Sequence, residues 1–146
     1  MKDAFGGIVN IMFIAVFLLA ISGILALIVN YNKAFQMKNI AISAIEEYEG
    51  SRGCFSTTSN GDTLCRQKIE AEAKEIGYHP TFMNCNEDDG YSLSDNYFCW
   101  KRERTESGNH WVYRIITQVD IDFPIVNRLT GLSIFQVHGD TRPLAK

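Results

Sequence analysis

Four cysteines have the most obvious chemistry in this chain, and all lie in its second part: Cys54, Cys65, Cys85 and Cys99. Their spacings are too wide for the C-x2-C pairs of a structural zinc site. An even number of cysteines in a small domain beside a membrane segment is typical of disulfides formed on the oxidising side. Of the three possible pairings we favour Cys54–Cys65 with Cys85–Cys99, because each closes a short polar loop and could add roughly 3 kcal/mol of stability. Four reduced, buried thiols are the alternative.

Patterns for catalysis and metal binding are weaker. The histidines are scattered: His79, His110 and His138. No Gly-flanked serine or similar nucleophile motif accompanies them, so a catalytic triad is not expected. The acidic segment "NCNEDDGYSLSD" offers oxygen ligands for calcium from four positions: Asn84, Asn86, Asp88 and Asp95. An EF-hand loop starting at Asn84 would need glycine where Asp89 stands, so a solvated turn is the better interpretation. We predict no catalytic, cofactor-binding or metal-binding residues and no enzymatic activity.

The segment "YFCWKRERTESGNHWVYR" gathers aromatic and basic residues, as in surfaces that stack single-stranded nucleic acid. Four of its aromatics instead fit the alternation of a buried strand face. Its opposed charges predict a self-neutralising hairpin tip, formed by Arg102, Glu103, Arg104 and Glu106. The whole chain has a net charge of −3 and no basic cluster, so no nucleic-acid partner is expected.

The element that must position all of these residues begins near the N-terminus. No charge occurs from Gly6 to Asn32, and residues 8–29 are long and apolar enough to cross the bilayer as a helix. A secretory signal would have a shorter apolar region and a small-residue cleavage site, which is not convincing here. We therefore predict a short leader or N-terminal tail at 1–7 and a retained membrane helix at 8–29, with membrane lipid as its first partner.

The helix is expected to continue beyond the membrane, because residues 30–49 contain no helix breaker and Gly50 stands where a C′ glycine would end it. One face of the 30–50 extension is apolar at helical spacing: Met37, Ala41, Ala44, Ile45 and Tyr48. A bend near Asn30 to Asn32 is the alternative. Within the membrane part, small residues predict a helix–helix packing site: Ser22, Gly23 and Ala26.

Residues 51–146 are long enough for one small domain. Asn60 and Gly61 mark a turn, and Asp62 could cap the next helix. The segment "TLCRQKIEAEAKEIG" places an apolar stripe on that helix before Gly77 ends it: Cys65, Ile69, Ala73 and Ile76. An extended piece is expected near Tyr91 to Leu93. The segments "YFCWKRER" and "HWVYRIITQVDID" predict a hairpin, and "LSIFQVHGDTRP" predicts a last strand after the interruption at Pro124. The expected fold is α+β, with the long helix covering a three-stranded antiparallel sheet.

The second strand predicts two different faces. One face is apolar: Trp111, Tyr113, Ile115, Thr117, Val119 and Ile121. The other is more polar: Val112, Arg114, Ile116, Gln118, Asp120 and Asp122. The apolar face is the one expected under the helix.

The opening "KDAFGGIVNIMFIAVFLLAISGILALIVNYNKAFQMKN" and the ending "DIDFPIVNRLTGLSIFQVHGDTRPL" resemble TadE-like pseudopilins of tight-adherence pili, and the architecture is similar to type IV pilins. The resemblance covers both ends of the chain, and the cysteine-containing middle lies outside it. Prepilins are cut after a glycine and carry a glutamate five residues later; here Met12 or Ile11 occupies that position. The resemblance implies a pilin-like architecture better than it implies peptidase processing.

Two functions follow from these features. The first is a non-enzymatic, pilin-like or pseudopilin subunit, whose partners are other pilin-like subunits or a pilus assembly platform. The alternative is a single-pass, membrane-anchored extracellular binding module held by disulfides. Lys33 and Lys38 after the span weakly favour a cytoplasmic domain, whereas the cysteines favour an extracytoplasmic one, and we give the cysteines more weight. The expected location is the cell membrane, with an extracellular filament as the assembled form.

Overall fold

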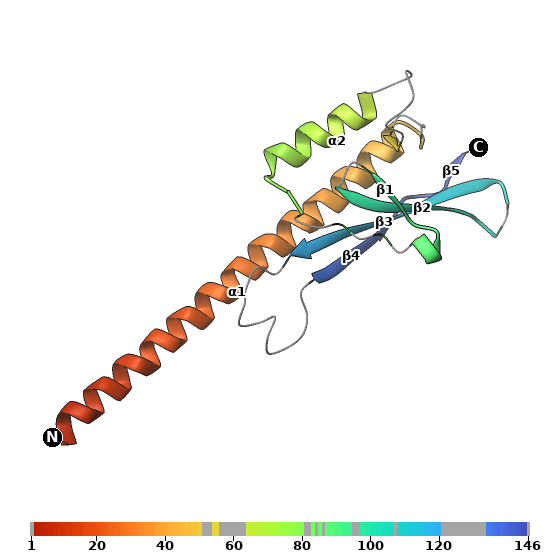
Figure 1. The fold of residues 1–146 in the computed structure, drawn as a ribbon. Helices are drawn as coiled ribbons and strands as arrows, with labels where there is room; N and C mark the ends of the chain where they lie inside the picture. Colours follow the sequence, from red (N-terminus) through yellow and green to blue (C-terminus); the bar gives the residue numbers. More distant parts are fainter. Residues whose placement is uncertain are drawn as a thin grey trace.

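The computed structural model describes residues 2–50, 54–55, 64–80, 83, 85, 87–94, 97–106, 108–120 and 134–145. Their helices are α1 (Lys2–Glu47), α2 (Leu64–Glu75) and the 3-10 turn η2 (Glu87–Asp89). The strands are β1 (Ser92–Ser94), β2 (Phe98–Arg104), β3 (His110–Asp120), β4 (Ile134–Asp140) and β5 (Leu144–Ala145). The second half of α1 lies across one face of the sheet, while its first half extends away from the domain (Figure 1). This arrangement is the predicted α+β class.

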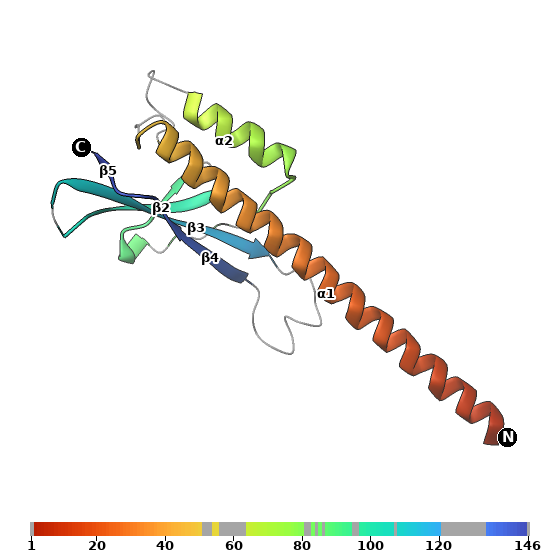
Figure 2. The same cartoon turned by 180° about the vertical axis from the view of Figure 1, so that it is seen from behind.

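Helix α1 is a single element of 46 residues, so the alternative of a break near Asn30 to Asn32 is wrong. Those positions lie inside the continuous helix, and the ribbon shows no break there from either side (Figures 1 and 2). No proline or glycine occurs between Asn30 and Glu49 to interrupt the i to i−4 hydrogen bonds. The apolar and amphipathic parts therefore form one rod.

The C-terminus of α1 is a Schellman motif shifted by one residue from the prediction. Gly50 N–H donates to the Ile45 carbonyl at 2.8 Å, and Glu49 N–H to the Glu46 carbonyl at 3.4 Å. These bonds place Glu49, not Gly50, at C′, and Glu49 has the left-handed φ of 50°. Gly50 has a different requirement: its φ is 68°, and a Cβ there would stand 2.7 Å from the Tyr113 ring.

The predicted stripe on the second half of α1 is confirmed. Tyr48 is partly buried against the core. The other four residues of the stripe are fully buried: Met37, Ala41, Ala44 and Ile45. Ala34 extends the stripe by one turn toward the membrane end. Three of these residues are alanines, so the helix backbone can lie close to the sheet.

The sheet has more strands than the three that were predicted. It has five antiparallel strands in the order β1-β2-β3-β4, with β5 pairing the start of β3. The hairpin of β2 and β3 pairs Trp100 with Ile115 and Arg104 with Trp111, as its sequence indicated. The expected extended piece at 91–93 is β1, which pairs Leu93 with Cys99. The unpredicted strand is β5, which is only two residues long.

The α1 side of the sheet is the predicted apolar face of β3. Tyr113, Ile115, Thr117 and Val119 are all buried there. The opposite, more polar face is itself partly covered, because Ile116 is only 7% exposed and Gln118 only 2%. Ile116 is the direct neighbour of Cys99 across the strand pair, so the disulfide helps to cover it.

Helix α2 packs beside α1 and buries Cys65, Ile69 and Ala73, as predicted (Figure 2). Gly77 is the C′ residue with φ 63°, as the sequence indicated, and Tyr78 N–H completes the motif by donating to the Ala73 carbonyl at 3.0 Å. The fourth residue of the expected stripe, Ile76, is partly buried against the core.

The disulfides have the predicted pairing. Cys54–Cys65 joins the segment after α1 to the first turn of α2, with Cα atoms 5.0 Å apart. Cys85–Cys99 ties the segment before η2 to β2, with Cα atoms 5.6 Å apart. Several sequence expectations lie outside the described residues: the turn at Asn60 and Gly61, the cap by Asp62, the interruption at Pro124 and the strand positions Ile121 and Asp122.

We predict that Glu49→Gly stabilises the protein by about 0.5–1 kcal/mol, because glycine removes the strain of a side chain at the left-handed C′ position. The measurement is the guanidinium midpoint of the full chain in mild detergent, followed by tryptophan fluorescence. Gly50→Ala is the matched control, and it should lower the midpoint because the new Cβ meets the Tyr113 ring. A lower midpoint for Glu49→Gly would contradict the assigned cap.

Candidate functional site

The first half of α1 exposes an apolar surface on every side. Ile21 is 39% exposed and Phe13 71%, and the other large apolar side chains that are exposed between Ile8 and Val29 fall between these values. Soluble domains seldom expose a contiguous apolar patch above a few hundred Å². The helix is long and apolar enough to cross a membrane, and none of its most apolar stretch is buried. It is the candidate single membrane span and the largest candidate interaction surface.

The predicted helix–helix site lies on this exposed part of α1. Ser22 and Ala26 are exposed, and Gly23 is half-buried by its own helix neighbours. The Ser22 hydroxyl donates to the Leu19 carbonyl at 2.9 Å, so its polar group is satisfied within the helix and tolerates lipid. A close helix–helix approach at these residues remains a prediction.

The span joins the domain through two hydrogen bonds. The Thr117 hydroxyl donates to the carbonyl of Ala34 at 2.9 Å, and both residues are fully buried. Lys33 Nζ donates to the Gly77 carbonyl at 3.2 Å, which places a cation at the C-terminus of α2. The α1 helix, the sheet and α2 are thus bonded to one another at the level where the exposed rod begins.

Lys38 also has a structural role at this end of the domain. Its ammonium lies 4.0 Å from the centre of the Phe35 ring. A Cβ at Gly139 would stand 2.6 Å from Lys38 Cδ and 2.8 Å from Ile42 Cδ1, so β4 passes directly under these side chains. Lys33 and Lys38 therefore serve domain packing, and their charge is weak evidence about membrane orientation.

The Tyr78 hydroxyl bonds the backbone of β3 just past its pairing with β2. The register of β2 and β3 runs from Arg104–Trp111 to Cys99–Ile116, and Gln118 lies two residues further along β3. The Tyr78 hydroxyl donates to the Gln118 carbonyl at 2.8 Å and accepts from the Gln118 N–H at 3.1 Å. Both tyrosine and glutamine are buried, so this residue joins the end of α2 to the sheet.

The charges of the hairpin pair differently from the prediction, which placed Glu103 with Arg102 and Arg104. Glu103 points to the face away from α1, where its carboxylate bonds Lys101 at 2.9 Å and Arg114 at 3.2 Å. Arg114 also lies 3.7 Å from Asp140 on β4. Residues at even and odd positions of a strand point to opposite faces, so Glu103 cannot pair with both of its arginine neighbours.

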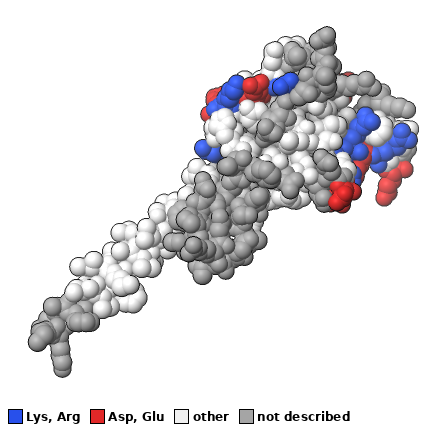
Figure 3. Space-filling view, viewed as in Figure 1, with Lys and Arg blue, Asp and Glu red and all other residues white. Residues whose placement is uncertain are grey.

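Arg102 and Arg104 point to the α1 side, beyond the end of that helix. Their guanidinium carbons lie 4.2 and 4.9 Å from the centre of the Trp111 ring. Among the described residues no carboxylate forms an ion pair with either arginine. In the space-filling view, basic and acidic side chains gather over α2 and at the hairpin end of the domain, while the described part of the rod shows neither colour (Figure 3).

The remaining aromatics of the hairpin belong to the core, as predicted. The Phe55 ring stacks on Trp100 at 4.1 Å and on Tyr113 at 5.1 Å between ring centres. Phe55 directly follows the cysteine of the first disulfide, which brings its ring onto the sheet. Trp100 Nε1 is buried and has no hydrogen-bond partner among the described residues. These rings leave no exposed ladder for stacking bases.

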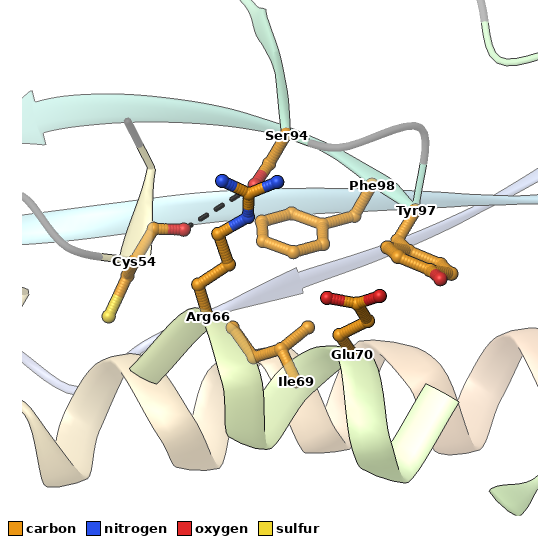
Figure 4. Close-up of a pocket in the computed structure, with 7 residues that line it drawn as sticks. All are labelled: Cys54, Arg66, Ile69, Glu70, Ser94, Tyr97 and Phe98. Atoms are coloured by element: carbon orange, nitrogen blue, oxygen red, sulfur yellow. Dashed lines mark hydrogen bonds between the residues drawn. The ribbon is translucent and has the colours of Figure 1, made fainter. Parts of the chain in front are cut away.

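Cavities lined by described residues border both faces of the sheet, and two of them differ in size. The first lies between α2 and the β1–β2 edge and holds about 10 Å³, at most one water molecule. Arg66, Ile69 and Glu70 project from α2 toward Phe98 and Tyr97 around it, and Ser94 donates to the Cys54 carbonyl at 3.4 Å (Figure 4). It is a packing defect and not a ligand site.

The second cavity, of about 270 Å³, lies on the face away from α1. It is lined by Cys85, Asp89, Tyr91, Cys99, Ile116, Gln136 and His138. Of the three histidines considered in the sequence analysis, His138 lies at this cavity. His110 begins β3, and His79 follows α2. Within the described ranges no three His, Cys, Asp or Glu side chains gather in a metal-binding group. Of the calcium candidates, Asn84, Asn86 and Asp95 lie outside those ranges.

A scan against protein-family models, a search of curated proteins and a search of solved structures each found no match to this chain. The evidence for function is therefore the geometry of the chain itself. Its most informative parts are the exposed apolar half of α1, the hydrogen bonds at Lys33 and Ala34 that join α1 to the domain, and the β2–β3 hairpin, which carries different charges on its two faces.

We predict that Tyr78→Phe destabilises the full chain by about 1–3 kcal/mol, because phenylalanine keeps the packing but removes two hydrogen bonds to buried backbone groups of Gln118. The free energy of unfolding in guanidinium measures the effect. Tyr48→Phe is the control, since Tyr48 is only partly buried. An equal, small change in both variants would contradict the bridging role of the Tyr78 hydroxyl.

The hydrogen bond from Lys101, assisted by the charge of Arg114, lowers the pKa of Glu103 below its ordinary value of 4.5. A lowered pKa means that folding favours the charged form. Its contribution to stability is therefore present above pH 4.5 and is lost as the pH falls through the lowered pKa. We expect Glu103→Gln to flatten this part of the curve of thermal midpoint against pH. Parallel curves for wild type and Glu103→Gln would contradict the assignment.

Proposed function

We propose that this protein is a non-enzymatic, pilin-like subunit, of the TadE-like pseudopilin kind that its two ends resemble. The observation that carries the proposal is the division of one unbroken helix. The first half of α1 is exposed and apolar, and the second half is buried against a sheet from Ala34 onward. Such a rod can remain in lipid as a stored subunit, and it can pack against other rods when the subunit is assembled.

The size of the exposed surface explains why the rod needs lipid or other helices. Fifteen large apolar side chains are exposed between Ile8 and Val29. At about 1.5–3 kcal/mol for each side chain, their exposure to water would cost on the order of 20–45 kcal/mol. That exceeds the stability of a typical small domain. A subunit that leaves the bilayer must therefore transfer this surface directly into a helix bundle.

An extracytoplasmic domain is the orientation that the disulfides support. One bridge joins Cys54 to α2 and the other joins Cys85 to β2, and no free cysteine occurs among the described residues. Such bridges persist on oxidising sides of membranes. Intact mass of protein from its native membrane, alkylated with and without prior reduction, tests this. Four thiols that react without reduction would contradict the orientation.

A second candidate function is an anchored binding module, and the cavity near His138 is the observation that favours it. Its lining combines the apolar Ile116 with polar groups of Tyr91 and Gln136. A cavity of about 270 Å³ is near the lower end of small-molecule sites. This function predicts a monomer in the membrane that binds a ligand through the sheet, whereas the pilin-like function predicts contact between spans.

We predict that Gly23→Ile reduces assembly of the full chain without preventing membrane insertion. Isoleucine keeps the span apolar but adds a branched side chain where another helix would approach closely. Chemical cross-linking in native membranes, resolved as dimers and higher species, measures assembly. Leu25→Ile is the control at an exposed site and should cross-link like wild type. Wild-type chains that insert but never cross-link would overturn the pilin-like function in favour of the anchored module.

A further inference from the structure

The hairpin tip carries a cationic patch, defined as Arg102, Arg104 and Trp111. Both arginines are exposed on the same face of β2, and Trp111 lies directly opposite Arg104 in the register. Their stacking on the indole fixes the planar guanidinium groups and leaves their N–H edges available to a carboxylate. The other cations of the hairpin, Lys101 and Arg114, already have carboxylate partners.

A complementary acidic surface is present on the same chain at η2. Asp88 and Asp89 are exposed there, and Gly90 turns the chain with φ 78° directly after them. A Cβ at Gly90 would stand 3.6 Å from Lys101 Cε, which places this turn beside the face of the sheet that points away from α1. Among the described residues Asp88 forms no ion pair.

The patch and the turn lie on opposite faces of the sheet. Arg102 and Arg104 share the face of Ile115 and α1, whereas Lys101, beside η2, shares the face of Arg114. In the ribbon, η2 lies across the sheet from α1 (Figure 1). The sheet therefore keeps the two surfaces apart within one chain, and contact between them requires two copies.

We propose that the cationic patch of one copy binds the acidic turn η2 of a second copy, as a contact between neighbouring assembled subunits. The inference rests on the proposed pilin-like function, because parallel spans are what bring two domains side by side. Two different surfaces make this contact heterologous, and a heterologous contact that does not close into a ring continues from subunit to subunit. The apolar rods supply the affinity, and the charges set the register between domains.

The test is cross-linking of full-length variants in native membranes. Arg102→Glu combined with Arg104→Glu should reduce species larger than a dimer by about tenfold, and Asp88→Arg combined with Asp89→Arg should reduce them in the same direction. The four changes together should restore these species to well above either parent, because the patch is then negative and the turn positive. We call the series of cross-linked species larger than a dimer the ladder. The wild-type ladder should become weaker as the salt concentration rises, since exposed ion pairs are screened.

The matched control is Lys68→Glu with Lys74→Glu, which makes the same charge change on the exposed side of α2 and should leave the ladder unchanged. Non-reducing intact mass checks that each variant keeps both disulfides. A second measurement uses Arg104→Lys in mixed light and heavy isotope-labelled chains, treated with a zero-length carboxyl–amine cross-linker. We expect a link from this position to η2 between light and heavy chains.

The outcomes separate the two proposals. The charge contact is overturned, and the pilin-like function stands, if wild type forms the ladder but two results are negative. These are an unchanged ladder in Arg102→Glu/Arg104→Glu and the absence of a light–heavy cross-link between position 104 and η2. A ladder that is lost in the variants and not recovered by the charge exchange also overturns the contact. If wild type forms no ladder at all, the pilin-like function itself fails.

Discussion

The structure depends on one close contact, where the second half of α1 lies on β3 and β4. Alanines form most of the buried stripe, Gly139 leaves room for Lys38 and Ile42, and the Thr117 hydroxyl bonds the Ala34 carbonyl inside the core. A helix that approaches this closely is fixed in position along its axis and around it. Among the described side chains, none before Ala34 is buried on this helix, so the packing of its second half sets the direction of the exposed half.

Side-chain hydrogen bonds join backbone groups at the ends of the strands and helices to the rest of the domain. The Tyr78 hydroxyl bonds the backbone of Gln118 on β3, and Lys33 bonds the last turn of α2. The disulfides hold the neighbouring segments to the nearest helix or strand, with Cys54 joined to α2 and Cys99 to the segment before η2. A domain this small has little core, so such covalent ties add stability to its apolar burial.

Periodicity was sufficient to predict the elements that bury a long stripe. The apolar positions of α1, the alternation in β3 and the local disulfide pairing were all evident in the sequence. Strands of two or three residues, such as Leu144–Ala145, are too short to show a period and depend on a neighbour for their geometry. The cap at Glu49 was misplaced by one residue because the adjacent Gly50 is glycine for a separate reason, its closeness to the Tyr113 ring. The helix–helix site at Gly23 requires a second chain, so it remains a prediction.

The absence of a hinge in α1 has a mechanical consequence. At 1.5 Å per residue its 46 residues span about 69 Å, and no proline or glycine occurs between Asn30 and Glu49. A force applied along the axis of such a stiff helix at its apolar end would displace the whole domain by the same amount. Rotation about the long axis would likewise turn the hairpin with the apolar end. In the proposed pilin-like subunit, machinery that grips the apolar end could thereby reposition the hairpin without contacting it.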